Sequence, residues 1–362
     1  MPAAGSGAEH ATVHLNVRRH TLRLRAPLIS AYGAVGERVV LSVWLQDEDG
    51  AVGYGEAAPL AAYDGVSVQR VEQALEHYRP VLAASAGLNG AEIVDACRRA
   101  DDLPEAFAAI DMALWDRAGR RAGKPVAALI TDSPAPSVAV NATISALDRA
   151  GASEGAAAAA AAGFACLKLK VGSGDDAGRL AAVRAAAGAQ MAIRLDANGA
   201  WTVEQAVRNI EALAPAGLEL VEEPVHGLSA VRAVRERVAT RVAIDETAVE
   251  HGALTAGVAD AVCLKISRCG GISGLLAAAT LVRASGAEAY VASTLDGPLG
   301  IAAAMHAAAA LASRGALPAC GLATLGMFDE VPADLLAPRQ GQIALPSGPG
   351  LGVEPLPNTD AL

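Results

Sequence analysis

The stretch ACLKLKVGSGDDAGRLAAVRAAAGAQMAIRLDANGAWTVEQAVRNIEALAPAGLELVEEP (residues 165–224) decides the fold class. It contains three short apolar segments that end in charged residues, and Ala-rich sequence of helical character separates them. Strands that alternate with helices in this way run parallel, and they form either a closed barrel or an open, doubly wound sheet. The stretch therefore predicts an α/β protein.

The same alternation extends toward both ends of the chain. The predicted strands are Val138–Thr143, Cys166–Val171, Met191–Leu195, Leu218–Val221, Arg241–Ile244, Ala261–Lys265, Glu288–Ala292 and Ala319–Leu322. Helical segments between them include Asp148–Ala162, Val203–Leu213, Ile272–Ala284 and Ile301–Ala312. Eight such strands favour a (β/α)8 barrel over a doubly wound sheet, which would use fewer strands and a Gly-rich first turn.

The N-terminal third of the chain has a different pattern. Apolar residues alternate from Thr12 to Tyr54, and Asp47–Gly50 is typical of a hairpin turn. Helical periodicity follows in Val66–Ala84, Gly90–Arg99 and Pro104–Ala122. We therefore expect an α+β capping domain over residues 10–132 and a barrel over residues 137–330. The Pro-rich tail, residues 331–362, is expected to pack on the capping domain as irregular structure.

Composition excludes several classes of function. The chain of 362 residues is 52% hydrophobic with a net charge of −10, which argues against a nucleic-acid groove or an anionic membrane as partner. No apolar run is long enough for a membrane span. Five cysteines without CxxC spacing and seven histidines without paired spacing argue against a disulfide framework and a zinc site. We expect a cytoplasmic protein that acts on a small, anionic substrate.

Charged residues follow the predicted strands at intervals of about one strand and one helix. They are Lys168 and Lys170, Asp196, Glu222 with Glu223, Asp245, and Lys265. An Asp after a strand is often only a helix cap, and a lone Lys is usually a solvated surface residue. The joint pattern favours a functional site, because the chain has only four lysines and three of them stand at these positions. In a barrel, the C-terminal ends of the strands form the active site.

The chemistry of this set is consistent. Three carboxylates on successive strands provide the oxygen ligands that Mg²⁺, or Mn²⁺, prefers. Lys168 and Lys170 lie on the same face of one strand, and their mutual repulsion is expected to lower the pKa of one of them so that it acts as a base. Lys265 would lie across the barrel axis. The set suits removal of a proton α to a carboxylate beside a metal ion.

Several of these motifs resemble those of the enolase superfamily, in its muconate-lactonizing-enzyme subgroup. They are LKLK (167–170), RLDANGAW (194–201), VEEP (221–224), IDET (244–247), LKISRCGG (264–271) and, in the N-terminal part, GEAAPL (55–60). The resemblance implies the metal ligands Asp196, Glu222 and Asp245, the acid/base pair Lys170 and Lys265, and the electrostatic helper Lys168. It further implies outer groups Asn198, Glu223 and Glu246, capping loops 27–33 and 59–65 that set specificity, and a homo-oligomer.

The reaction within the subgroup depends on the end of the eighth predicted strand. Dipeptide epimerases of the subgroup carry Asp-x-Asp there, which binds the substrate ammonium, whereas residues 319–326 of this chain contain no acid. This stretch, with residues 140–143 and 293–297, resembles o-succinylbenzoate synthases. The resemblance predicts dehydration of the succinyl-hydroxycyclohexadiene carboxylate of menaquinone synthesis. It places Ser293, Thr294 and Ala323 at the substrate.

Other functions stay open at this point. Arg268 stands three residues after Lys265, and cationic residues at that place also occur in epimerases and N-succinylamino-acid racemases. Muconate-type cycloisomerisation uses the same scaffold. From another class, the chain could be a barrel that binds a ligand without turnover. Phosphate binding at Gly172–Gly174 is disfavoured, because neither GKS/T nor a full GxGxxG is present.

Overall fold

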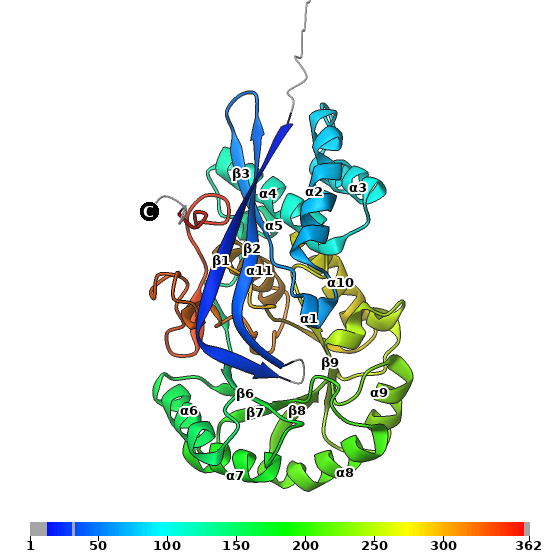
Figure 1. Ribbon diagram of the computed structural model, residues 1–362, viewed down its shortest axis with the longest axis vertical. Coiled ribbons are helices and arrows are strands. Elements are labelled where there is room, and N and C mark those ends of the chain that lie inside the picture. The colour runs from blue at the N-terminus through cyan, green and yellow to red at the C-terminus, as the bar shows by residue number, and fades with distance from the viewer. Residues whose placement is uncertain (1–12, 31–32, 358–362) are drawn as a thin grey trace, which may run out of the picture.

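The capping region begins with a three-stranded antiparallel sheet. The computed structural model describes residues 13–30 and 33–357, so the first residues of the predicted capping domain lie outside the described residues. The sheet has the order β1 (Val13–Ser30), β2 (Gly33–Asp47), β3 (Val52–Ala57). The predicted hairpin turn at residues 47–50 is confirmed, since it joins β2 to β3. Figure 1 shows this sheet as a long twisted ribbon beside the barrel.

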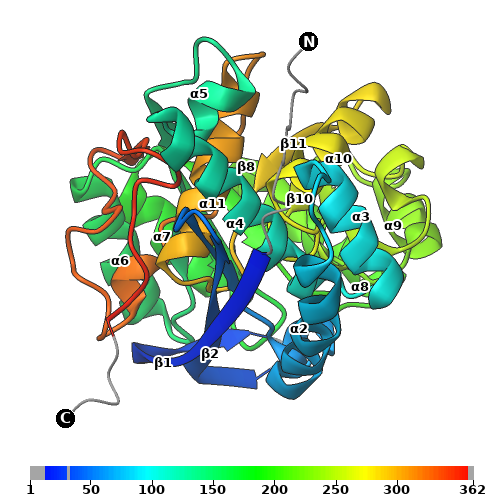
Figure 2. The ribbon, with the colours of Figure 1, turned by 90° about the horizontal axis from the view of Figure 1, so that it is seen from above.

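Five helices follow this sheet in the chain, namely α1 (Ala61–Asp64), α2 (Val68–Ala83), α3 (Gly90–Ala100), α4 (Pro104–Ala122) and α5 (Val126–Ile130). The periodicity predicts α2, α3 and α4, and these three helices are confirmed. Ser67 caps α2 and Asn89 forms a capping box with Glu92 at α3, so the chain itself specifies where these helices begin. Apolar side chains of the sheet and of α2, α3 and α4 form a core of their own. Figure 2 shows α4 between the capping sheet and the barrel.

The barrel contains seven parallel strands in the order β11-β10-β9-β8-β7-β6-β5. Its strands are β5 (Ala142–Ile144), β6 (Cys166–Lys170), β7 (Ala192–Asp196), β8 (Leu218–Glu222), β9 (Val242–Ile244), β10 (Ala261–Leu264) and β11 (Glu288–Val291). Its helices are α6 (Arg149–Ala161), α7 (Asp176–Ala187), α8 (Val203–Leu213), α9 (Leu228–Arg235), α10 (Ile272–Ala284) and α11 (Pro298–Ala312). The curled sheet confirms the α/β prediction and disagrees with an open, doubly wound sheet.

Two of the predicted strands differ in the structure. The first is divided, because β4 (Ser137–Ala139) leaves the barrel to pair with β12 (Gln342–Ala344) and only β5 joins the sheet. The predicted eighth strand at 319–322 is confirmed only in part, because this segment pairs through single bridges instead of forming a regular strand. That segment makes single parallel bridges to both edges of the sheet, Cys320 with Val140 and Gly321 with Ala292. A Cβ at residue 321 would lie 2.9 Å from the Ala292 Cβ, so this close contact needs glycine.

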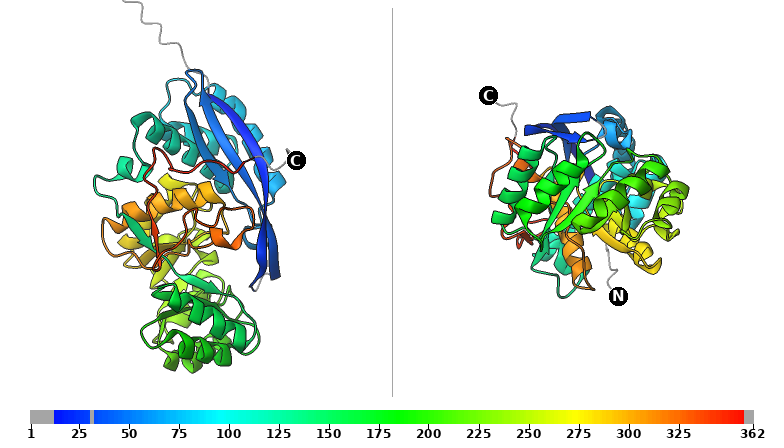
Figure 3. Two further views of the ribbon diagram at one scale, coloured as in Figure 1. Left: turned by 90° about the vertical axis from the view of Figure 1, so that its left-hand side faces the viewer. Right: turned by 90° about the horizontal axis from the view of Figure 1, so that it is seen from below.

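The C-terminal tail contacts both parts of the molecule. It forms β12 beside β4, although the sequence pattern predicted only irregular structure in the tail. Further along, the Leu351 amide donates to Asp116 of α4, and the Val126 amide donates to the Gly350 carbonyl. Figure 3 shows the tail running between the barrel and the capping sheet. Among the described residues, none of the helices is long and apolar enough to cross a membrane.

Candidate active site

A cavity of about 110 Å³ opens at the C-terminal ends of the strands, below the capping region. Its walls come from three sources. The strand ends contribute Thr143, Lys168, Lys170, Asn198, Asp245 and Lys265. The loops after β11 and along 319–326 contribute Ala292, Ser293, Thr294, Leu295, Gly321 and Thr324, and the capping region contributes Leu28, Val35, Leu60, Ala62 and Tyr63.

The paired lysines of β6 lie between two carboxylates. Lys168 Nζ is 2.8 Å from Glu222 Oε1 and 2.8 Å from Asp196 Oδ2. Lys170 Nζ donates to the same Asp196 oxygen at 2.6 Å and to Asn198 Oδ1 at 2.8 Å. The alternation of side chains along a strand places both lysines on the inner face, as predicted. Asp196 and Glu222 have no solvent-exposed surface, so these are interior ion pairs.

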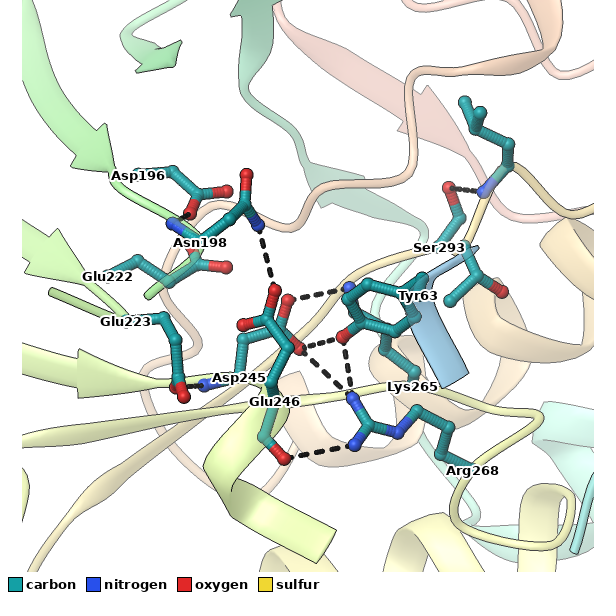
Figure 4. A network of polar contacts seen from close by, with 12 residues as sticks. Tyr63, Asp196, Asn198, Glu222, Glu223, Asp245, Glu246, Lys265, Arg268 and Ser293 are labelled. Carbon is teal, nitrogen blue, oxygen red and sulfur yellow. Dashed lines mark hydrogen bonds and ion pairs between the residues drawn. The ribbon is translucent and has the colours of Figure 1, made fainter. Parts of the chain in front are cut away.

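The third carboxylate pairs with the third lysine. Lys265 Nζ donates to Asp245 Oδ2 at 2.7 Å, and Asp245 Oδ1 accepts from the Tyr63 hydroxyl at 2.7 Å. Figure 4 shows Tyr63 between Lys265 and Arg268. Its ring centroid lies 4.3 Å from Lys265 Nζ, which is a cation–π distance. Sequence reasoning pointed to the 59–65 loop but missed Tyr63 itself.

Arg268 does not line the cavity. Its guanidinium donates to the Tyr63 hydroxyl at 2.6 Å and to the Glu246 carbonyl at 3.0 Å. It lies instead in a larger groove of about 680 Å³, between the capping region and α10. That groove reaches Asp245 and Lys265, but Lys168 and Lys170 line only the smaller cavity.

The three predicted outer groups connect the ends of β7, β8 and β9. Glu223 Oε2 accepts from the Asp245 amide at 2.7 Å, and its Oε1 accepts from the Thr247 amide at 3.0 Å. Asn198 Nδ2 donates to Glu246 Oε1 at 2.9 Å (Figure 4). Glu223 is the neighbour of Glu222 in the chain, and its side chain turns sideways to the end of β9.

The backbone is strained where these groups leave their strands. Asn198, Glu223 and Leu295 have φ values of 44°, 39° and 61°, in the left-handed region that residues other than glycine seldom adopt. Each such residue costs on the order of 1 kcal/mol and persists only when its surroundings hold it. Residues of this kind cluster at functional sites, which agrees with the position of this cavity.

The protein charges shift the pKa values of the site. Burial lowers the pKa of Lys168, but attraction to Asp196 and Glu222 outweighs it and the net pKa lies above the ordinary value. Lys265 behaves in the same way beside Asp245. The prediction that repulsion within the pair lowers a lysine pKa is therefore wrong for Lys168. Burial raises the pKa of Glu222, more than the attraction of Lys168 lowers it.

The donor set fits a hard divalent cation. Glu222 Oε2 is buried and accepts no hydrogen bond from any described residue, although a buried acceptor normally has a partner. Donor atoms of Glu222, Asp245 and Cys263 lie within 4.8 Å of one another. The Asp196 carboxylate, held by two lysines, stands outside this group but shares Lys168 with Glu222. Carboxylate oxygens suit Mg²⁺, whereas the Cys263 thiol does not.

The opposite wall of the cavity carries hydroxyl groups. Ser293 Oγ and Thr324 Oγ1 are 3.0 Å apart, and Thr294 Oγ1 is 3.1 Å from Asp296 Oδ1. Ser293 and Thr294 were predicted at the substrate, and both line the cavity. The structure places Thr324 in the lining rather than its neighbour Ala323. Because residues 319–326 form no regular strand, alternation could not tell which of the two points inward.

Comparison with known proteins agrees with this geometry. Residues 152–359 match the family described as Enolase C-terminal domain-like. Residues 12–131 match the N-terminal domain of mandelate racemase / muconate lactonizing enzyme. A hydrophobic dipeptide epimerase from Enterococcus faecalis is 31% identical over 82% of this chain and 86% of that protein. An o-succinylbenzoate synthase from Thermobifida fusca is 37% identical over 58% of this chain and 67% of that protein.

Solved structures extend the comparison to three dimensions. The dipeptide epimerase from Enterococcus faecalis, crystallised with Mg and L-Leu-L-Tyr, has a TM-score of 0.85 at 29% identity. The similarity covers 94% of this chain and 99% of that one. Fold and site thus define an enzyme of the mandelate racemase / muconate lactonizing enzyme type. The chain belongs to the enolase superfamily and, within it, to the muconate-lactonizing-enzyme subgroup.

Proposed function

We propose that this enzyme is a Mg²⁺-dependent o-succinylbenzoate synthase, which dehydrates the succinyl-hydroxycyclohexadiene carboxylate of menaquinone synthesis. One observation carries the proposal. The cavity lining contains three lysines and one carboxylate, Asp245, and that carboxylate already accepts from Lys265 and Tyr63. A substrate with carboxylates and no ammonium group is complementary to such a surface, whereas an α-ammonium group would lack a counter-charge.

Asp196, Glu222 and Asp245 are the proposed ligands of the cation. The buried, unpartnered Glu222 Oε2 and the all-oxygen donor set support this assignment. Bound there, Mg²⁺ would supply positive charge next to the substrate carboxylate as negative charge develops on it. Glu223 would keep the ligand Asp245 in place, since it accepts from the Asp245 amide. Asn198 and Glu246 would do the same between β7 and β9.

Lys170 is the proposed base. In its neutral form, Lys170 Nζ takes the α-proton, so that the carbon–hydrogen bond breaks and a nitrogen–hydrogen bond forms. The carbon–oxygen bond of the leaving hydroxyl then breaks, and Lys170 returns the proton so that water departs. Lys168 holds Asp196 and Glu222 beside this lysine. The Lys265 ammonium lies on the opposite face and stabilises the negative charge.

Substrate contacts are assigned to the hydroxyl wall and to the capping residues. One hydroxyl of the Ser293–Thr324 pair can donate to a substrate oxygen, while Leu28 and Val35 cover the apolar ring. The Thr294 hydroxyl donates to Asp296 and can accept from the substrate. The cavity is smaller than the usual ligand cavity of about 300 Å³ or more. Substrate would therefore enter only when the capping residues move away from the strand ends and the cavity widens.

Dipeptide epimerisation is the second candidate, because the relative that covers most of this chain among those described above is a dipeptide epimerase. Assays of the purified protein with Mg²⁺ separate the candidates, including racemisation and cycloisomerisation. We expect dehydration to have the highest kcat/KM. Exchange of the α-hydrogen of N-succinylamino acids or dipeptides for deuterium, without any dehydration, would overturn the proposal.

A further inference from the structure

A carboxyl group of the capping region reaches the first turn of a barrel helix. Glu56, the last but one residue of β3, has 2% of its surface exposed. Its Oε1 accepts from the Gly297 amide at 2.6 Å, and the amides of Leu299 and Gly300 also donate to the carboxyl group. Gly297 precedes α11, so Glu56 satisfies amides at a helix N-terminus that have no partner within the helix.

Two glycines make room for this carboxyl group. A Cβ at residue 297 would lie 2.5 Å from Glu56 Oε2, and one at residue 300 would lie 2.8 Å from Glu56 Oε1. Neither glycine has a positive φ, so backbone conformation does not require glycine at these positions. Glycine is needed because a side chain would block the approach of the Glu56 carboxyl group. The contact is thus built from both partners, the GEAAPL motif of the capping region and the GPLG sequence at residues 297–300.

The helix start that Glu56 holds is continuous with the hydroxyl wall of the cavity. Asp296, next to Gly297, accepts from the Thr294 amide and from Thr294 Oγ1, both at 3.1 Å. The Leu295 amide donates to Ser293 Oγ at 3.3 Å. A movement of residues 296–297 would therefore displace the two hydroxyl groups that face the substrate.

Few charges surround the Glu56 carboxyl group. Burial raises the pKa of Glu56, and repulsion from Asp296 raises it further, to about 8. Arg38 of β2 donates to the carbonyls of Ala58 and Pro59, and its charge acts on Asp296, Glu56 and Asp64 of α1. Loss of the Glu56 proton would leave two buried carboxylates facing each other across Gly300, with Arg38 as the neighbouring cation.

We infer that Glu56 is a positioning residue: its neutral carboxyl group anchors the start of α11 to the capping region and thereby fixes the Ser293 and Thr294 hydroxyls at the substrate cavity. The capping region then does two things: it covers the cavity, and through Glu56 it positions the hydroxyl groups of the cavity wall. When Glu56 loses its proton, repulsion from Asp296 loosens residues 293–300. Specificity for an anionic substrate would weaken in the same pH range.

Amide hydrogen exchange of residues 293–300 tests this inference without any substrate. In Glu56→Ala, exchange of these amides is expected to rise by at least about tenfold, because three amides lose their acceptor and each such hydrogen bond contributes roughly 1–1.5 kcal/mol. In Glu56→Gln, which keeps the acceptor but cannot ionise, exchange stays near that of the wild type at neutral pH. Above pH 8, corrected for intrinsic rates, exchange rises in the wild type and not in Glu56→Gln.

Asp116→Asn is the matched control. Asp116 is another buried carboxyl of the capping region that accepts from backbone amides, those of Tyr54 and Leu351, and it too lies against a glycine, Gly350. It does not line the cavity. Its variant is expected to lower the unfolding stability while exchange at residues 293–300 stays unchanged.

The kinetic part of the test rests on the proposed function, and the exchange part does not. With the dehydration substrate, Glu56→Ala is expected to raise KM about tenfold with a smaller change in kcat, by the same lost hydrogen bonds. Wild-type KM rises above pH 8, and KM of Glu56→Gln does not. Equal exchange in the wild type and Glu56→Gln above pH 8 would overturn the inference, even if Glu56→Ala fails to fold. Absence of turnover in the wild type would overturn only the proposed function.

Discussion

The two halves of the cavity wall differ in kind. The charged half consists of Lys168, Lys170, Asp245 and Lys265 at the ends of β6 to β10, and the buried carboxylates Asp196 and Glu222 pair with Lys168 behind this lining. The neutral half consists of Ser293, Thr294 and Thr324, with Leu28 and Val35 of the capping region. The charged half is built on regular strands, and the neutral half on loops and on a second part of the chain.

This difference separates chemistry from selection of substrate. Strand ends hold charged groups at fixed positions, because backbone pairing fixes each strand against the next. Loops can change sequence without disturbing that pairing. Under the proposed function, the charged half would carry out proton removal next to a cation, and the neutral half would decide which molecule undergoes it.

Substitution of the proposed base should have the largest effect. Lys170→Ala is expected to lower the rate of α-proton removal by about 10³-fold, within the usual contribution of a general base. Deuterium exchange at the α-carbon with Mg²⁺ measures it. Lys124→Ala is the control, because Lys124 is exposed and lies outside the cavity. A Lys170→Ala protein that still exchanges at the wild-type rate would show that the charged half does not carry out the chemistry.

Removal of one proposed ligand charge should weaken cation binding. Glu222→Gln keeps the shape of the side chain and removes its charge, and we expect Mn²⁺ affinity to fall by about 100-fold. Calorimetric titration measures this directly. Glu219→Gln is a suitable control, since Glu219 lies on the same strand but pairs with Arg194 instead. Equal losses in the two variants would mean that the ligand assignment is wrong.

An added acid in the neutral half should change substrate preference. Thr324→Asp places a carboxylate beside the Ser293 hydroxyl. We expect kcat/KM for the dicarboxylate substrate to fall by about tenfold relative to that for a substrate with an α-ammonium group, because the new charge repels one and attracts the other. Thr324→Asn, which adds no charge, provides the control. If the ratio of the two kcat/KM values stayed unchanged, Thr324 would not contact the substrate.

The smallest effect on activity is expected at a contact between capping region and barrel away from this wall. Asp111 of α4 accepts from the Ser273 amide at 3.0 Å, and burial raises its pKa from 3.8 to about 6. A raised pKa means that the folded state holds the proton more tightly, so unfolding free energy falls as pH rises from about 4 to about 6 and is constant above. The expected fall is about 3 kcal/mol.

Asp111→Asn should remove this pH dependence and leave kcat/KM near the wild-type value at neutral pH. Denaturant unfolding at pH 4.5 and pH 7 measures the difference for both proteins. A pH dependence that persists unchanged in the variant would assign it to another carboxyl group.

Sequence predicted the charged half far better than the neutral half. Periodicity located the ends of β6 to β10, and pairing of neighbouring strands then brings Lys170, Asp196 and Glu222 together. Tyr63 contacts Asp245 from the capping region, 182 residues earlier in the chain, and no local pattern encodes such a contact. The choice between Ala323 and Thr324 failed for a different reason, because an irregular segment has no side-chain alternation to follow.

Other expectations stay predictions. The domain limits 10–132, 137–330 and 331–362 and the homo-oligomeric state belong to this group. The raised pKa of Lys168 shows why the pKa values of the site could not be predicted from the sequence. Repulsion between two lysines is evident from their spacing, but the attraction of Asp196 and Glu222 depends on distances that only the folded strands define.

The most direct test is the position of the cation. Crystals soaked in Mn²⁺ and measured at the manganese absorption edge would give an anomalous peak at the bound ion. We predict one strong peak within about 2.5 Å of carboxylate oxygens of Asp196, Glu222 and Asp245, with the Lys168 ammonium displaced by the ion from at least one of them. A peak at Glu223, His226 and Glu246, a second group of donor atoms among the described residues that are close enough to hold an ion, would contradict it.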